Sequence, residues 1–488
     1  MASHHVDIKD ERLEFGTHAW PFYSTGLFVG FIAILASVAI GYYEGDGFRR
    51  FYFSWLIGLV FFLAIALGGL FFVILQHLVR AGWSVTVRRI AENISASTWV
   101  LFVLSAPILL SVVMQKGDLY RWAQPKPAHV NEHAAVASTS HQATESHGDP
   151  HTATTSAAHG DTHSAATPES QASSKPVDEQ GFHGGQVEVA QKHLDAKAIP
   201  PLDELTLKKR AWLNPGFFVI RIIFYFACWS LAGWWYWRKS VQQDETKELQ
   251  LTSTLETVSA PLMLVFALTL TFGIIDLMMS LDPHWFSTMF PVVYFSNACI
   301  AIFATLIIVS KVLQKRGFLT ASVSVEHYHD LGKLLFAFTF FYGYVAFSQY
   351  MLLWYANLPE TTAWFARRGV STMEGIPATY GTYTPLALVC LFGHILIPFA
   401  GLLSRHVKRN SFGLTFFAGW QLVMIYFDMY WLILPELEPT LRFHILDLTC
   451  LVGIGGLFLA TVVRTAAGHS LRPTADPRLD EALAFHNI

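Results

Sequence analysis

Charged residues are scarce in this sequence. Asp, Glu, Lys and Arg make up 14% of its 488 residues, whereas hydrophobic residues make up 53% and aromatic residues 15%. Soluble globular domains carry about 25% charged residues, so the composition excludes a soluble globule. The formal net charge is −3, and the Lys and Arg residues lie between hydrophobic runs rather than in one patch. Nucleic acid is therefore set aside as a partner.

Cysteines are also few. Cys228, Cys299, Cys390 and Cys450 lie singly in four different hydrophobic runs, and neither C-x-x-C nor C-x-x-C-H occurs. Covalent haem c, iron–sulfur clusters and structural zinc need grouped cysteine ligands. We expect none of these groups, and no metal site, in this chain.

Apolar stretches near 20 residues, the length that crosses about 30 Å of hydrocarbon, dominate the sequence. They lie at 24–43, 52–78, 98–115, 216–237, 258–281, 290–313, 331–356, 383–404, 413–433 and 444–465. Backbone groups inside a bilayer must be hydrogen-bonded internally, so each stretch is predicted to be a helix. The segment before the first stretch lacks the pattern of a cleaved signal peptide. The sequence predicts an all-α polytopic membrane protein of about ten transmembrane helices.

The positive residues of the short connections predict an orientation. One set of connections holds most of them: Arg80, Arg88, Arg89, Arg238, Lys239, Lys247, Lys311, Lys315, Arg316, Arg405, Lys408 and Arg409. The opposite set holds Arg49, Arg50, Arg367, Arg368 and Arg442. Both termini are therefore predicted to be cytoplasmic.

These assignments divide the chain into four parts. Residues 1–115 are predicted to hold the cytoplasmic N-terminus and helices one to three, and 116–210 a periplasmic loop. Residues 211–466 hold helices four to ten, and 467–488 a cytoplasmic tail. The middle of the loop is rich in Ala, Ser, Thr, Pro and His and is predicted to be disordered. Its histidines, from His129 to His193, are irregularly spaced, which favours a solvated linker over a metal site.

Ionisable residues within or beside the predicted helices are the candidate functional residues, because a charge at a helix centre costs about 2.5–3.5 kcal/mol. The predicted periplasmic side holds Asp276, Asp282, His284, Asp428, Glu436, His444 and Asp447. His394 is predicted near mid-membrane, and His77, Glu92 and Glu256 on the cytoplasmic side. Hydroxyls between these groups come from Tyr225, Tyr294, Tyr342 and Tyr344. The pattern suggests two polar half-paths that meet near mid-membrane.

Two roles fit these residues. They form a proton relay, as ionisable groups in transmembrane segments often do, or they cap and cross-link helices. Arg221 either pairs with an acid of the periplasmic side or extends to the membrane surface. His77, His394 and His444 fall at three different depths, so the sequence predicts no pair of haem ligands.

Four long phrases carry a family resemblance: WLNPGFFVIR (212–221), SLDPHWFSTMFPVVYF (280–295), HYHDLGKLLFAFTFFYGYVAFSQYMLLWYANLPE (327–360) and LLSRHVKRN (402–410). They resemble the second large quinone-site-type membrane subunit of bacterial alternative complex III, a quinol:cytochrome c oxidoreductase. That subunit is similar to the membrane anchors of the polysulfide-reductase (NrfD-like) family. The resemblance covers nearly all of the hydrophobic sequence but not the histidine-rich loop.

The resemblance implies two antiparallel four-helix bundles, helices two to five and six to nine, flanked by helices one and ten. It also implies a bacterial inner membrane and three kinds of partner: a sister NrfD-like membrane subunit, a periplasmic iron–sulfur subunit and haem-c subunits. The expected function is a subunit without its own redox centre that anchors partners and provides proton half-channels. In a variant of this hypothesis a quinone of the menaquinone type binds against its aromatic walls. The alternatives are a secondary transporter and a purely structural scaffold.

Overall fold

The computed structural model describes residues 11–125 and 202–486, in which ten helical spans are long and apolar enough to cross a membrane. The spans consist of α1 (Ala19–Tyr43), α2 (Arg49–Leu78), α3 (Val85–Ala96) continued by α4 (Thr98–Leu104) and α5 (Ala106–Val113), α9 (Pro215–Thr246), α10 (Gln250–Leu277), α11 (Phe290–Lys315), α12 (Val325–Ala356), α14 (Thr384–Val389) continued by the π-helix η7 (Cys390–Leu396) and α15 (Ile397–Leu403), α17 (Ser411–Ile433) and α18 (Ile445–Ala466). Short helices α8 (Glu204–Lys208), α13 (Pro359–Ala366), α16 (Arg405–Arg409) and α19 (Leu479–Leu483) lie outside the spans. These residues form no strand, which confirms the all-α prediction.

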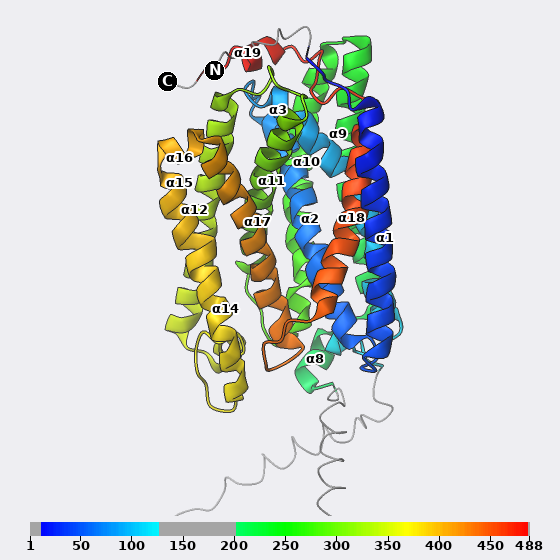
Figure 1. Cartoon of the computed structure of the whole chain (residues 1–488). Coiled ribbons are helices and arrows are strands. Elements are labelled where there is room, and N and C mark those ends of the chain that lie inside the picture. The colour runs from blue at the N-terminus through cyan, green and yellow to red at the C-terminus, as the bar shows by residue number, and fades with distance from the viewer. Residues whose placement is uncertain (1–10, 126–201, 487–488) are drawn as a thin grey trace, which may run out of the picture. The chain divides into compact units, whose positions relative to one another are not determined.

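The spans form two four-helix bundles, as expected. In the first bundle α2, α3–α5, α9 and α10 pack in a ring, and in the second α11, α12, α14–α15 and α17 do the same (Figure 1). Helices α2 and α11 pack against each other and join the bundles. A Cβ atom on Gly68 of α2 would lie 2.1 Å from the carbonyl oxygen of Ala298 of α11, so glycine permits this close approach.

Helices α1 and α18 flank the bundles as a pair. Glycines line their contact, and a Cβ atom on Gly456 of α18 would lie 2.7 Å from the Cα atom of Gly30 in α1. Small residues let membrane helices approach closely enough for extensive van der Waals contact. Because α18 also packs on α2, this pair attaches to the first bundle through α18.

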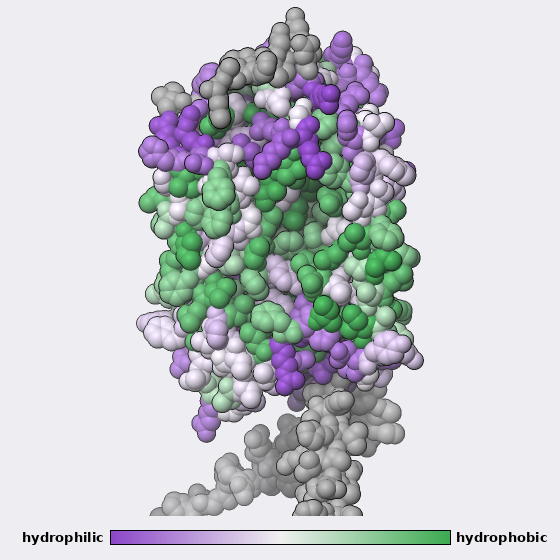
Figure 2. Space-filling model, in the orientation of Figure 1, coloured by the Kyte–Doolittle hydropathy of each residue, from purple (hydrophilic) through white to green (hydrophobic). Residues whose placement is uncertain are grey.

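The outer surface matches a membrane environment. Side chains such as Phe28, Leu264 and Phe347 are more than 60% exposed on their helices. A band of hydrophobic side chains crosses the middle of the molecule, with hydrophilic side chains concentrated at its two ends (Figure 2). The chain is therefore a membrane-spanning helical protein.

Both ends of the described chain lie at the same end of the bundles (Figure 1). Bridges pair Arg12 with Phe318 and Glu14 with Ser470 there. We call this the termini end, and the opposite end, where residue 125 precedes and residue 202 follows the long connection, the loop end. The histidines between His129 and His193, and the predictions about them, lie outside the described residues.

The largest error in the predicted helices concerns the third span. It was predicted to begin at residue 98, but it begins at Val85. The segment 85–96 contains two arginines and a glutamate, which lowered its apparent hydrophobicity. These charges form ion pairs with one another inside the protein, so the helix extends through them.

Candidate functional site

The interior of the second bundle holds a polar cluster formed by Asn297 of α11, Tyr342 of α12, His394 of η7 and Asp428 of α17. The Tyr342 hydroxyl donates a hydrogen bond to Oδ1 of Asp428 over 2.8 Å, and the Asn297 amide donates to Oδ2 over 2.6 Å. All four side chains are buried. We call these residues the Asp428 cluster.

His394 stacks on Tyr342, with ring centroids 4.2 Å apart. Its side chain is 0% exposed, and neither ring nitrogen has a hydrogen-bond partner among the described residues. Buried polar groups without partners are rare and costly. His394 also lies in a π-helix, a geometry that frequently marks functional sites. The sequence predicted that His394 lies near mid-membrane. Its packing against Tyr342 was not predicted and comes from the structure.

A second interior cluster lies in the first bundle, nearer the termini end. The ring of His77 stacks on that of Tyr236, with centroids 5.4 Å apart. The hydroxyls of Tyr236 and Ser259 are 2.6 Å apart, and both are buried. The ring nitrogens of His77, like those of His394, have no hydrogen-bond partner in the described part of the chain. Each bundle therefore contains a buried histidine stacked on a tyrosine.

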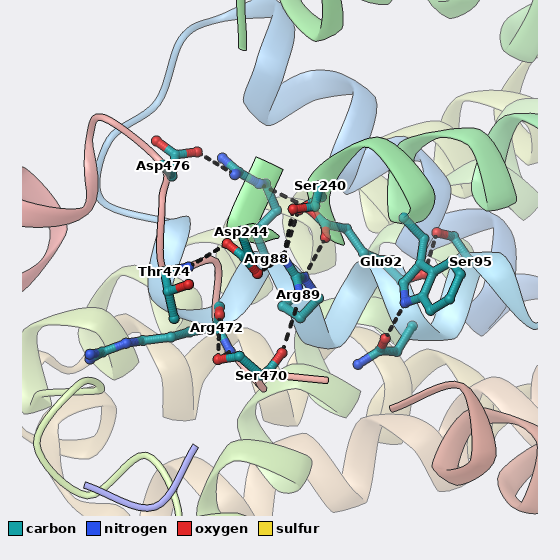
Figure 3. Close-up of polar contacts among 12 residues, drawn as sticks. Arg88, Arg89, Glu92, Ser95, Ser240, Asp244, Ser470, Arg472, Thr474 and Asp476 are labelled. Carbon is teal, nitrogen blue, oxygen red and sulfur yellow. Dashed lines mark hydrogen bonds and ion pairs between the residues drawn. The ribbon is translucent and has the colours of Figure 1, made fainter. Parts of the chain in front are cut away.

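Charged residues of α3 and the C-terminal tail form a network at the termini end (Figure 3). Glu92 accepts hydrogen bonds from Nε of Arg88 over 3.1 Å and from Nε of Arg89 over 2.9 Å. Arg89 also pairs with Asp244 of α9 at 2.7 Å, and Arg88 pairs with Asp476 of the tail. None of Arg88, Arg89 and Glu92 is more than 1% exposed. Glu92 is thus fixed between two arginines inside the protein.

The C-terminal tail packs over this end of the first bundle. Asp244 accepts hydrogen bonds from the backbone amides of Thr474 and Ala475. Although burial raises the pKa of Asp476, the charge and hydrogen bond of Arg88 lower it below its usual value. Glu256 pairs with Arg80 and with Arg478 of the tail. The predicted tail therefore folds back onto the helices and covers Arg88 and Glu92.

Two predicted acids at the loop end form buried pairs with arginine. Arg221 and Asp276 make a bidentate pair, with Nε–Oδ2 2.7 Å and Nη2–Oδ1 2.9 Å, which confirms that Arg221 pairs with an acid. Asp447 pairs with Arg50 at 2.7 Å. It also accepts a hydrogen bond from the backbone amide of His444 and so caps α18.

Three other predicted residues join a second ion-pair group at the loop end. Glu436 lies 3.0 Å from Arg368 and 3.3 Å from Arg367, which also pairs with Asp282. The carboxylates of Asp282 and Asp203, which lie 3.6 Å and 2.7 Å from the two ring nitrogens of His284, raise its pKa to about 9. Burial raises the pKa of Asp282, but its hydrogen bond with His284 and the charge of Arg367 lower it well below its usual value.

The partners of Asp428 distinguish it from the other predicted acids. Asp276, Asp282, Glu436, Asp447, Glu92 and Glu256 each form an ion pair with at least one arginine. The side chains that donate to Asp428 are a neutral amide and a phenol. A neighbouring cation stabilises the charged form of a buried carboxylate. With only neutral neighbours, the free-energy cost of ionising the buried group is larger.

The polar partners of the remaining predicted residues lie outside both interior clusters. Tyr225 bonds Asp276 at 3.2 Å, and Tyr294 donates to the carbonyl oxygen of Val60. His444 lies 2.8 Å from Glu44 at the loop end. The side chain of Tyr344 is 61% exposed on the outside of α12, so its predicted place between the polar groups is wrong. Sequence reasoning missed Asn297, whose only signal was an amide in an otherwise apolar run.

The two interior clusters do not meet. Between α2, α11 and α12 the bundles contact through phenylalanines, including Phe71, which packs edge-to-face on Phe295 and Phe338. Among the described residues no hydrogen bond joins the His77 cluster directly to the Asp428 cluster, although Tyr294 of α11 bonds the carbonyl oxygen of Val60 in α2. The two clusters therefore lie in different bundles, and aromatic rings are among the side chains packed between the bundles.

Comparison with known proteins does not extend this description. No protein-family model matches the chain, and no curated protein matches it. Sequence and structure together identify the chain as a membrane-spanning helical protein. Each of its two four-helix bundles contains a buried polar cluster.

Proposed function

We propose that this chain is a membrane subunit of a quinol-oxidising respiratory complex and that it moves protons without carrying a redox centre. In this proposal it lies in a bacterial inner membrane with its termini end on the cytoplasmic side. Its partners are a sister NrfD-like subunit, a periplasmic iron–sulfur subunit and haem-c subunits. The four phrases between residues 212 and 410 support the family assignment.

The observation that carries the proton role is the burial of Asp428 among neutral partners, one of which, Tyr342, stacks on His394, a ring with no hydrogen-bond partner among the described residues. A buried carboxylate without a cation is costly, and taking up a proton removes that cost. We assign Asp428 as the residue that takes up and releases the proton, Tyr342 as the residue that positions it, and His394 as the next acceptor.

The His77 cluster supports a second half-path at the termini end. His77 lies beside the hydroxyls of Tyr236 and Ser259, and the arginine–glutamate network lies at the same end of the bundle. Because no hydrogen bond between described residues joins the two clusters directly, proton transfer between the half-paths would need a change in the packing of α2 against α11.

A structural scaffold is the second candidate, because most of the predicted acids are held by arginines and cross-link helices. The variant in which a quinone binds this chain has no room inside the first bundle, where the cavity lined by Leu70, Ile74 and Trp229 has a volume of about 10 Å³. Ligand pockets are typically about 300–1,000 Å³, and the hollow of about 450 Å³ lined by Trp234, Trp237 and Arg238 of α9 falls in that range.

The test compares two tyrosines two residues apart on α12. The complex would be purified through this chain, reconstituted in proteoliposomes, and assayed for quinol oxidation and for protons released per electron. Asp428→Asn and Tyr342→Phe are expected to lower the proton ratio, whereas Tyr344→Phe, at an exposed site, leaves it unchanged. Equal ratios in all variants would favour the scaffold. Purification of the chain without cytochromes would contradict the complex itself.

A further inference from the structure

The termini end of the second bundle contains a group of basic side chains that the proton hypothesis does not use. Lys408 of α16 lies along α12, where its Cγ atom would be 3.2 Å from a Cβ atom on Gly332. Its ammonium group lies 5.2 Å from the ring centroid of Phe336, one turn further along α12. The side chain is 8% exposed, so a lysine is buried between the two helices.

His329 lies one turn before Gly332 on the same face of α12. It is 6% exposed, and its Nδ1 atom has no hydrogen-bond partner among the described residues. Lys333, Lys408 and Arg409 are all near enough to His329 to interact with it electrostatically. Basic groups from α12 and α16 therefore converge on one site.

The acids at this site do not balance its charge. Asp330 pairs with Lys333, and Glu326 pairs with Arg409. No carboxylate of the described residues forms an ion pair with Lys408, or with the exposed Arg405, which lies one turn before Lys408 on α16. Burial, together with the charge of Lys333, lowers the pKa of Lys408. A buried ammonium group without a counter-ion is costly, so the site favours an added anion.

Apolar surface continues from this site toward the middle of the membrane. Lys408 donates to the carbonyl oxygen of Leu403 over 3.4 Å, and the Leu403 side chain is 62% exposed. Phe336 and Phe340 of α12 both pack on Phe399 of α15. Hydrophilic side chains gather at this corner above the hydrophobic band (Figure 2). An anionic group bound by Lys408 would therefore have hydrocarbon-compatible surface directly beside it.

We propose that Lys408, Arg405 and His329 bind the phosphate of an anionic phospholipid whose acyl chains lie against α12 and α15. Basic pockets between membrane helices bind such head groups, and each basic residue near an anionic membrane surface contributes about 1 kcal/mol. The exposed side chains of Phe340 and Leu403 near the basic group favour a lipid over a free anion. This inference does not depend on the proton hypothesis.

The test is native mass spectrometry of the delipidated full-length protein in detergent. The probes are dioleoyl phosphatidylglycerol, dioleoyl phosphatidylcholine and inorganic phosphate. The wild type is expected to bind phosphatidylglycerol more tightly than phosphatidylcholine. Lys408→Gln and Arg405→Gln should each weaken phosphatidylglycerol binding about fivefold, and Lys408→Arg should retain it.

Lys315→Gln is the matched control, because Lys315 is an exposed lysine at the last residue of α11, at the termini end of the bundles. Arg405→Gln changes an exposed side chain, so it keeps the test valid if Lys408→Gln fails to fold. Equal binding of phosphatidylglycerol by the Lys408, Arg405 and Lys315 variants would overturn the proposal. Binding of inorganic phosphate that competes fully with the lipid would also overturn it, since the site would then take a free anion.

Discussion

The carboxylate of Asp428 accepts a hydrogen bond from the Tyr342 hydroxyl over 2.8 Å, and no arginine of residues 11–125 and 202–486 forms an ion pair with it. In the first bundle Asp276 instead holds both Nε and Nη2 of Arg221. Two buried aspartates in the same protein thus have opposite electrostatic surroundings. The one with the cation serves as a helix cross-link, and the one without it is the better candidate for proton exchange.

This difference predicts unequal costs for the same substitution. Asp276→Asn leaves the buried Arg221 guanidinium without its counter-ion, which typically costs about 3–5 kcal/mol of folding stability. Asp428→Asn leaves no charge behind and keeps one acceptor oxygen, so we expect a loss below about 2 kcal/mol. Thermal unfolding of the two variants in the same detergent checks the order. A larger loss for Asp428→Asn would contradict the assignment of Asp276 as the structural acid.

A double substitution tests the pairing of Arg221 with Asp276 directly. Arg221→Met and Asp276→Leu should each be strongly destabilising, because each leaves one buried charge unpaired. The double variant leaves no unpaired buried charge. Its loss of folding stability should therefore be smaller than the sum of the two single losses by more than about 1 kcal/mol. Additive losses would show that the two side chains do not depend on each other. The measurement is the unfolding midpoint of all three variants and the wild type.

The positions of the helices were largely predictable, whereas the partners of the acids were not. Hydropathy located every span because a run of apolar residues is a local property of the sequence. It failed at the start of α3, where Arg88 and Glu92 are charged but mutually paired. The four-residue spacing of Arg88 and Glu92 is that of an ion pair on a helix. This spacing indicates a helix that begins before residue 98.

Asp276 and Asp428 illustrate what the sequence could not supply. Both are aspartates near the loop-side end of an apolar helix, and nothing in their neighbouring residues separates them. Arg221 is 55 residues away from Asp276, and Tyr342 is 86 residues away from Asp428. Only the packing of helices decides which acid meets a cation. The same holds for the C-terminal tail, where Asp476 pairs with Arg88, a residue 388 positions earlier in the sequence.

The loop end predicts a pH dependence of stability. The carboxylates of Asp282 and then Asp203 beside its ring raise the pKa of His284 to about 9, above about 6.5 for an unfolded histidine. Burial opposes the shift at Asp203, but hydrogen bonds with Thr206 and His284 lower its pKa to about 2. Asp203 is therefore ionised throughout the neutral range. The stabilisation by protonated His284 is fully present below pH 6.5 and is lost as pH rises through 9.

Comparison with His284→Gln isolates this contribution. The unfolding midpoint of the wild type should exceed that of the variant at pH 6, and the difference should shrink between pH 6.5 and 9.5. Because His284 is about half exposed, with 48% of its side chain accessible, the effect should stay below about 1 kcal/mol. A difference that is constant over this range would mean that the ring does not titrate there.

The attachment of α1 depends on the absence of side chains at its contact with α18. A Cβ atom on Gly456 would lie 2.7 Å from the Cα atom and 2.8 Å from the nitrogen of Gly30. Both are backbone atoms, so rotation of a side chain cannot relieve the clash, and α1 must move away. We expect Gly456→Val to cost about 1–3 kcal/mol and to separate α1 from α18.

Gly419→Val is the control, because nothing lies within 4 Å of a Cβ atom at Gly419 in α17. Ser37 and Thr449 provide the reporter, since their hydroxyls are 2.8 Å apart across the α1–α18 contact. With cysteines at these two positions and Cys450→Ser in the background, disulfide formation should slow in Gly456→Val and stay unchanged in Gly419→Val. Because α1 packs mainly on α18, its release should leave the two bundles folded. If the cross-link formed at equal rates in both variants, the glycine contact would not hold α1 in place.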